Sequence, residues 1–403
     1  MKHGQKLGFI GRAIYSAATF PNKYIERFNK KDVKIKTGSE SQLLIKNPGL
    51  QTENYKVYDN AVDSGYLLIP CYNKAINQSY VKLLSLRNNT IIHTWTPDIE
   101  ELNKINESND VAARYINNTF EIINPILTKD TGLILKAENG MLYKLNKQSK
   151  IEWYVKGIFH HSIEQDADSN YWVPFTSPTT VLDTTIYPGL RDDCIVKISP
   201  QGKILYSHVM MKSLLNSGLE SQLVGMGNYE RSPLHLNDIQ PALYDTKYWK
   251  KGDLLISLRN RSTVILYRPS TDNIVWMQTG PWLNQHDVNF VDSTSISVFG
   301  NDVIRIDNQY HLARKHNTVY VYNFSTVSTT APYDAAFSAN DIHTERSGRG
   351  MILNNKDMFV EETYEGKLYR LNNSKVVWRY MEIIDANYVG RISWSRYYSR
   401  LPL

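Results

Sequence analysis

Four side chains between positions 235 and 286 are of the types that group transfer from an anionic ester requires. His235 and Asn237 stand in the run His-Leu-Asn-Asp, Arg259 in Ser-Leu-Arg-Asn, and His286 in Gln-His-Asp. An imidazole can act as a nucleophile or as a general acid and base. A fixed guanidinium can bind the oxygens of an anionic group. Whether they form one site depends on the elements that carry them.

Two adjacent histidines are further candidates. His160 and His161 open the run His-His-Ser-Ile-Glu-Gln-Asp. Neighbouring residues of a strand point to opposite faces, so at most one of the two imidazoles should reach a shared site. The run that begins at Asp166 imitates a calcium loop. It has Tyr171 where such a loop needs glycine and Ser177 where it needs glutamate, which favours a hairpin turn.

Composition indicates a globular protein rich in strands. The 403 residues are 42% hydrophobic and 21% charged, and they include 27 tyrosines and 8 tryptophans, which are typical of strands. The net charge of +6 favours anionic ligands only weakly, and no dense Lys/Arg run indicates nucleic-acid binding. Cys71 and Cys194 stand in strand-like runs and are expected to be buried thiols rather than a bridge. No Cys/His spacing indicates a metal site.

Several other classes lack their sequence signals. No run approaches the roughly 18 apolar residues of a membrane span. Arg12 interrupts the apolar stretch 8–20, which also lacks a clear cleavage site. The sequence therefore leaves open whether the protein is cytosolic or has lost a leader. It has no phosphate-binding glycine loop and no nucleophile elbow, which argues against nucleotide cofactors and serine hydrolysis.

A repeat predicts the fold. An apolar alternation, a polar turn and a strand with a closing aromatic residue recur about every 50 residues. The closing residues are Trp95, Trp153, Tyr206, Trp276 and Trp378. The longest interval leaves room for a hidden unit at 318–327. We predict an all-β, six-bladed β-propeller over residues 46–403, rather than a β-sandwich, with an N-terminal extension over 1–45. Helical insertions are expected at 98–116 and 210–224.

The repeat also predicts where the candidate residues meet. The inner strands of a propeller line a central channel. His161 or His160, His235 and His286 open three consecutive units, so these imidazoles should converge there. Arg259 extends the strand 253–258 and should point away from its apolar face. His343 is a weaker candidate in the last unit.

On these residues the sequence resembles the arylsulfate sulfotransferase family. The segments that carry the resemblance are 160–166, 235–238, 256–262 and 285–287, with a similar framework at 274–280 and 297–301. The resemblance extends over residues 65–380 and is strongest over 158–302. The ordered set is specific, although each segment alone is weak.

The resemblance implies a reaction and roles for the residues. The family moves a sulfuryl group from a phenolic sulfate ester to a phenol by a ping-pong mechanism. It uses a transient sulfohistidine and no phosphoadenosyl phosphosulfate or other cofactor. The position of the sulfated histidine matches His286, and His235, Asn237 and Arg259 match the sulfuryl site. The remaining imidazole is His161 or His160, with His161 preferred.

The chain departs from the family at its N-terminus. The first residues do not resemble the separate β-domain of the large bacterial members. The leader and disulfide typical of exported members are not evident either. The resemblance implies export or a periplasmic location, but the compartment and a homodimer stay open. The expected partners are an aryl sulfate donor and a phenolic acceptor. A non-catalytic propeller scaffold and a quinone-dependent propeller oxidoreductase are the alternatives.

Overall fold

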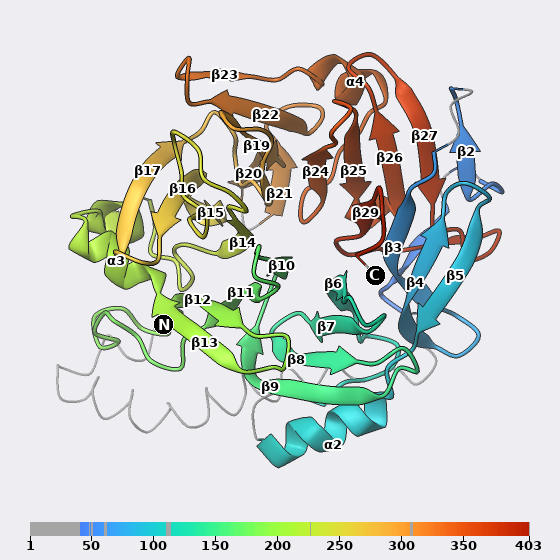
Figure 1. Ribbon diagram of the computed structural model, residues 1–403, viewed down its shortest axis with the longest axis horizontal. Helices are drawn as coiled ribbons and strands as arrows, with labels where there is room; N and C mark the ends of the chain where they lie inside the picture. Colours follow the sequence, from blue (N-terminus) through green and yellow to red (C-terminus); the bar gives the residue numbers. More distant parts are fainter. Residues whose placement is uncertain are drawn as a thin grey trace, which may run out of the picture. The chain divides into compact units, whose positions relative to one another are not determined.

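The described part of the chain is all-β and propeller-like, as the aromatic repeat predicted. The computed structural model describes residues 41–47, 49, 51–59, 63–109, 114–225, 227–306 and 309–402. Residues 42–403 form one unit, in which the sheets follow one another around a ring (Figure 1). Most of the predicted extension over 1–45 lies outside the described residues, so its boundary stays a prediction.

Four sheets have the form of separate blades. Three have four antiparallel strands each, and the fourth gains an extra strand at its edge. They are β14(Leu236–Pro241)–β15(Leu254–Leu258)–β16(Thr263–Arg268)–β17(Asn273–Thr279), β18(Asp287–Phe290)–β19(Ser295–Gly300)–β22(Thr318–Asn323)–β23(Ser328–Thr330), β29(Arg396–Tyr398)–β3(Tyr66–Asn73)–β4(Gln78–Ser85)–β5(Thr90–Trp95) and β24(Arg349–Ile352)–β25(Met358–Glu362)–β26(Lys367–Leu371)–β27(Val376–Met381)–β2(Tyr55–Val57). Two further pairs are β1(Leu44–Lys46)–β28(Tyr388–Gly390) and β20(Val303–Ile306)–β21(Gln309–Leu312).

The predicted count of six separate blades is wrong, because the remaining strands form a single eight-stranded sheet. Its strands are β6(Ile122–Leu127), β7(Leu133–Ala137), β8(Gly140–Leu145), β9(Ile151–Phe159), β10(Glu164–Gln165), β11(Tyr171–Thr176), β12(Asp193–Ile198) and β13(Ile204–Val209). A single pairing, Phe159 with Phe175, joins β9 to β11. Gly157 makes this approach possible, since a Cβ there would lie 2.2 Å from the Phe175 ring.

The aromatic residues of the repeat occupy equivalent strands. Trp95, Trp153, Tyr206, Trp276 and Trp378 lie in β5, β9, β13, β17 and β27, the strands that close their hairpins. The hidden unit expected at 318–327 contains β22. The repeat therefore reflects a recurring hairpin. Trp95 and Trp378 are buried, and full burial of such a side chain contributes about 1.5–3 kcal/mol, whereas Trp153, Tyr206 and Trp276 are half-buried.

In the part of the chain that the structure describes, helices are few and lie at the predicted insertions and in short turns. They are α2(Ile99–Asn109), α3(Met210–Asn216), α4(Asp334–Ala339), the π-helix η2(Ser221–Gly225) and the 3-10 turns η3(Arg259–Arg261) and η4(Thr363–Glu365). Asp98 caps α2 by accepting the N–H groups of Glu100 and Glu101, both at 3.1 Å. Within the described residues, none of these helices has the length and apolarity to span a bilayer. Cys71 and Cys194 are both free and buried, as predicted.

Strand β29, near the C-terminus, completes the sheet that contains β3, β4 and β5. Strand β29 pairs with β3, with Arg396 opposite Leu68 and Tyr398 opposite Tyr66. Figure 1 shows β29 near the middle of the ring, together with β6 and β10. The ring is thus closed by hydrogen bonds between strands more than 300 residues apart in sequence.

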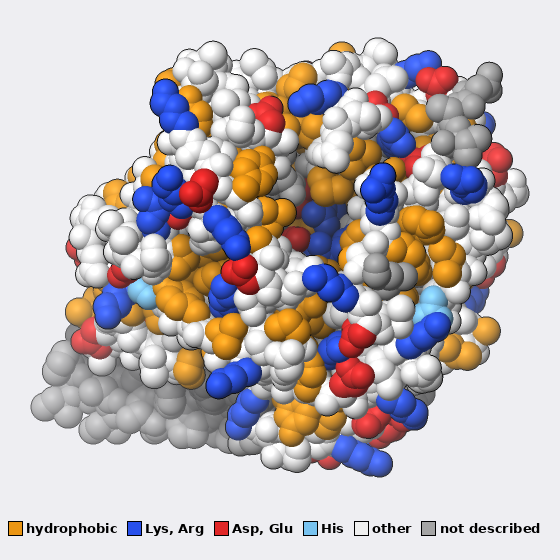
Figure 2. All heavy atoms as spheres, in the orientation of Figure 1, with side chains coloured by type: hydrophobic (Ala, Val, Ile, Leu, Met, Phe, Trp, Pro, Cys, Tyr) orange, Lys and Arg blue, Asp and Glu red, His pale blue; other side chains and the backbone are white. Residues whose placement is uncertain are grey.

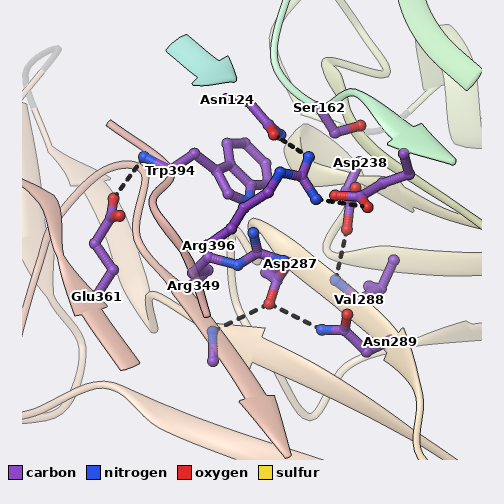
Figure 3. Close-up of polar contacts among 12 residues, drawn as sticks. Asn124, Ser162, Asp238, Asp287, Val288, Asn289, Arg349, Glu361, Trp394 and Arg396 are labelled. Carbon is purple, nitrogen blue, oxygen red and sulfur yellow. Dashed lines mark hydrogen bonds and ion pairs between the residues drawn. The ribbon is translucent and has the colours of Figure 1, made fainter. Parts of the chain in front are cut away.

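Buried charged side chains fill the middle of the ring (Figure 3). Arg396 donates to Glu164 Oε2 at 3.0 Å and to the Pro125 carbonyl at 2.8 Å. Arg349 Nη2 lies 3.3 Å from Asp287 Oδ1. We call these residues, together with Asp238, the central network. On the face drawn in Figure 2 the middle of the ring is hollowed, with Lys or Arg side chains deep inside.

Asp238 holds an unusual position in the central network. Its Oδ2 accepts the Val288 N–H at 2.8 Å, whereas its buried Oδ1 has no partner among the described residues. Burial raises the pKa of Asp238 well above its ordinary value, and the negative charges of Asp287 and Glu164 add to the effect. Burial and these neighbouring charges therefore favour the neutral form of Asp238, which brings the charge of the network closer to balance.

We expect the Asp238→Asn variant to be more stable than the wild type at pH 8, by roughly 2–4 °C in Tm. A carboxyl with a raised pKa in the folded state loses stability as the pH rises from its unfolded value toward the folded one. An amide cannot ionise and escapes that loss. Thermal unfolding measured from pH 4 to 9 should show a flatter profile for the variant.

The matched control is Asp287→Asn, which removes the partner of Arg349 and leaves that guanidinium buried without it. It should destabilise the protein by about 3–5 kcal/mol. The same dependence of Tm on pH in Asp238→Asn and in the wild type would contradict the assignment of the proton.

Candidate functional site

Three of the four residues singled out first by the sequence line one cavity of about 310 Å³. His235, Arg259 and His286 contribute to its wall, together with His161. The His161 ring centroid lies 4.9 Å from that of His235 and 6.5 Å from that of His286. Asn237 does not line the cavity. The structure thus brings together three imidazoles from three strand groups, and the guanidinium of Arg259 comes from the same sheet as His235.

Each imidazole is placed by a turn just before an inner strand. His161, His235 and Asn284 have left-handed backbone conformations, with φ of 52°, 49° and 50°. They precede β10, β14 and β18, respectively, by one to three residues. Residues other than glycine pay about 1–3 kcal/mol for such a conformation, and they cluster at functional sites. The fully buried Lys136 supports one turn, because its Nζ donates to the His161 carbonyl at 2.6 Å.

Asn301 determines the tautomer of His286. The Asn301 Nδ2 group donates to the carbonyls of Thr344 at 3.0 Å and Ser347 at 2.9 Å. Its Oδ1 therefore faces His286 Nδ1, at 2.5 Å, as an acceptor. Since an amide oxygen cannot donate, Nδ1 must carry the proton. The other ring nitrogen, Nε2, then holds a lone pair.

The lone pair of His286 is directed at a backbone donor of the cavity wall. The Ser347 N–H donates to His286 Nε2 at 3.2 Å. Ser347 has a left-handed conformation, with φ of 56°, and lines the cavity. A ring nitrogen with a lone pair and a fixed N–H donor therefore share one edge of the cavity.

Burial keeps all three imidazoles neutral at pH 7. It lowers the pKa of His235 to about 3, and the positive charge of Arg259 adds to this effect. The pKa values of His161 and His286 are likewise held well below 6.5, first by burial and then by His235 and Arg259, respectively. The site in its resting state offers bases rather than imidazolium acids.

Arg259 is a buried cation without an anionic partner. It is only 3% exposed, and no described carboxylate lies within ion-pair distance of it. Its Nη1 donates to Asn260 Oδ1 at 3.0 Å and to the Tyr310 hydroxyl at 3.1 Å, while Nε has no described partner. The predicted placement on a strand face is wrong, because β15 ends at Leu258 and Arg259 begins a 3-10 turn.

Three other predicted side chains lie outside the cavity wall. His160 contacts His161 through their Nδ1 atoms at 3.0 Å, and its Nε2 is 3.4 Å from Asp193 Oδ1. Asn237 is fully buried and donates to the Gln285 carbonyl at 2.9 Å. His343 Nδ1 bonds to the carbonyl of Asp341. His160 and Asn237 thus support the neighbours of the cavity rather than its surface.

The sequence reasoning missed Tyr310 and Ser347 of the cavity wall, and also Asn301, which lies behind His286. Tyr310 comes from the separate hairpin β20–β21 and contacts Arg259. Asn301 stood only in a framework segment, and the Ser347 N–H belongs to the backbone. The only sequence signal for the hairpin is the long interval before Trp378. Among the described residues, no group of His, Cys, Asp or Glu is placed to hold a metal ion.

Comparisons with known proteins agree with the propeller-like fold. A family model described as Arylsulfotransferase (ASST) matches residues 126–382, which contain the four lining residues named above. A solved protein of unknown function from Bacteroides caccae aligns with a TM-score of 0.52 at 12% identity, covering 83% of this chain and 99% of that one. Kuenenia stuttgartiensis hydrazine synthase aligns with a TM-score of 0.43 at 11% identity, over 73% of this chain and 70% of that one. No curated protein matches the sequence.

We expect Asn301→Asp to raise the pKa of His286 and to keep its proton on Nδ1. A carboxylate at this place still accepts that hydrogen bond, and its charge favours the imidazolium. Asn301→Ala should instead let the ring adopt either tautomer. Nitrogen-15 NMR of labelled histidine reads both the tautomer and the titration.

The matched control is Asn317→Asp. Asn317 Nδ2 donates to the Asn301 carbonyl at 2.7 Å and has no described contact with His286. Its substitution should leave the His286 tautomer unchanged. An unaltered His286 spectrum in Asn301→Ala would show that Asn301 does not set the tautomer.

Proposed function

The chain belongs to the arylsulfotransferase (ASST) family, and from that membership we propose that it transfers a sulfuryl group from a phenolic sulfate ester to a phenolic acceptor. His286 is the proposed nucleophile. One observation carries most of the proposal: the Nε2 lone pair of a neutral, buried His286 faces a cavity that also holds the unpaired Arg259.

Arg259 and the backbone of Ser347 are the proposed ligands of the sulfuryl oxygens. Sulfuryl transfer should resemble phosphoryl transfer in a loose transition state, with negative charge on the equatorial oxygens. Donors that are already fixed in a dry site stabilise that charge without reorganisation. The Ser347 N–H, now directed at Nε2, is well placed to donate to an oxygen once sulfur approaches this nitrogen.

The first half-reaction forms a sulfohistidine. The Nε2 lone pair attacks sulfur, the bond between sulfur and the phenolic oxygen breaks, and its electron pair leaves with the phenolate. The product histidine retains the Nδ1 proton, and the adjacent Asn301 oxygen stabilises the positive ring. No reductant, oxidant or second cofactor is needed for this balance. The phenol departs before the acceptor binds, which is a ping-pong scheme.

The departing phenolate takes its proton from His161 or His235. The conjugate acid of a phenolate has a pKa of about 10, so either imidazolium is acidic enough. Both imidazoles are neutral in the resting site because of burial. An anionic ester that enters beside them favours their protonated form, so proton uptake should accompany donor binding. The acceptor phenol then returns its proton to the same base and attacks sulfur.

Aromatic side chains support the choice of an aryl substrate. Tyr310, Tyr364 and Trp394 line the cavity beside the histidines and Arg259. Aromatic rings favour offset or edge contacts with a second ring. His160 and Asn237 are proposed to act as positioning residues, since they contact His161 and the segment before His286.

We expect His286→Ala to lose at least about a thousandfold in turnover of a chromogenic aryl sulfate, because no other group replaces the nucleophile. The wild type incubated with donor alone should gain one sulfuryl group on the peptide that contains His286, as measured by mass spectrometry. Full turnover by His286→Ala would contradict this mechanism. A folded wild type that releases no phenol from any aryl sulfate would favour a non-catalytic propeller.

The kcat/KM of the free enzyme should not fall as the pH is lowered from 8 through 6.5, and the proton taken up with the donor should make it rise. The nucleophile is active as the neutral base, and burial holds the pKa of His286 well below 6.5. Activity should decline only when the pH approaches that lowered value. Initial rates at low donor concentration measure this profile. An acid limb centred near 6.5 would contradict a buried, neutral His286.

A further inference from the structure

Three arginines line the cavity, and they differ in whether a carboxylate neutralises them. Arg259, Arg346 and Arg391 all contribute to the wall. Arg391 is already neutralised, because its Nε lies 2.9 Å from Glu121 Oε1 and its Nη2 donates to the Tyr364 hydroxyl at 2.9 Å. Arg259 has no carboxylate partner and is the cation for the sulfuryl group. Arg346 is left without a task in the proposed reaction.

Arg346 has no ionic partner of its own in the described chain. Within the described residues, its guanidinium contacts the Tyr310 ring, whose centroid lies 4.8 Å away. The same ring lies 4.7 Å from the guanidinium of Arg259. Tyr310 therefore contacts both guanidinium groups beside one cavity. The distance between the two groups is at most the sum of their distances to the Tyr310 ring centroid. A disubstituted benzene can span such a distance.

The acids of the cavity wall do not compensate these two charges. They are Glu121 and Glu138. Glu121 is occupied by Arg391, and Glu138 accepts the His161 backbone N–H at 3.4 Å. A sulfate ester supplies one negative charge for Arg259, which leaves the charge of Arg346 uncompensated. Like-signed charge at the mouth of a cavity attracts and orients an anion.

We propose that Arg346 binds a second anionic substituent on the aromatic ring of the sulfate donor, so that the site selects dianionic aryl sulfates. This proposal rests on the proposed function. The sulfuryl group lies between Arg259 and His286, the ring packs beside Tyr310, and the second anion faces Arg346. A carboxylate is the simplest such group, because a guanidinium binds it through two parallel hydrogen bonds.

The test uses sulfonates, which bind as the ester does but cannot transfer a sulfuryl group. Calorimetry would compare meta- and para-sulfobenzoate with their neutral carboxamides, which have the same shape. We expect the wild type to bind one of the carboxylates about fivefold more tightly than its amide. Arg346→Gln should remove that preference and leave the affinity for the amide unchanged.

The matched control is Arg305→Gln. Arg305 lies on β20 of the same hairpin, 3.3 Å from Glu230, and does not line the cavity. The Arg305→Gln variant loses the same positive charge as Arg346→Gln, and it should keep the preference for the carboxylate over the amide. Equal binding of carboxylate and amide by the wild type would overturn the proposal, as would a preference that survives in Arg346→Gln. Because neither outcome depends on turnover, failure of the proposed function appears separately, as absence of phenol release from simple aryl sulfates.

Discussion

The ring depends on the hydrogen bonds of Arg396 at its centre. This guanidinium sits on the last strand, yet it binds Glu164 and the carbonyls of Pro125 and Ile163, in the strand groups that follow. Burying an ion pair costs desolvation free energy, and the pair adds no net stability unless its donors and acceptors are matched. Here the bonds tie the chain's end to distant strands, and removal of either charge would leave the other buried alone. The network therefore specifies the geometry of the ring more than it stabilises the fold.

The same burial that closes the ring sets the chemistry of the cavity. A nucleophilic imidazole must be neutral, and burial next to Arg259 keeps His286 neutral. That environment also deprives His161 and His235 of the protons that a departing phenolate needs. The two demands are reconciled only if the substrate brings negative charge with it. In the proposed reaction an anionic ester would be both the ligand of Arg259 and the cause of proton uptake by its neighbours.

Much of the fold and part of the site could be predicted from the sequence. The hairpin repeat predicted the strands and the convergence of three imidazoles, and the cavity brings these together with Arg259, which the sequence had also singled out. The count of blades could not be predicted, because it depends on a single backbone pairing between Phe159 and Phe175. Asn301 was missed because its role depends on amide orientation, which distant carbonyls determine. The Ser347 donor could not be predicted either, because nearly every residue type has a backbone N–H.

His286, the proposed nucleophile, is coupled to the ring through its sequence neighbour. Asp287 follows His286 directly, and its carboxylate accepts the Gly350 N–H at 3.1 Å and meets Arg349 in the central network. The left-handed residue that begins this turn, Asn284, is strained, and such strain persists only where the surroundings over-determine it. The position of His286 is therefore set by contacts between strand groups rather than by its own sheet. A site built in this way is sensitive to changes in the buried charges beneath it, even where those charges touch no substrate.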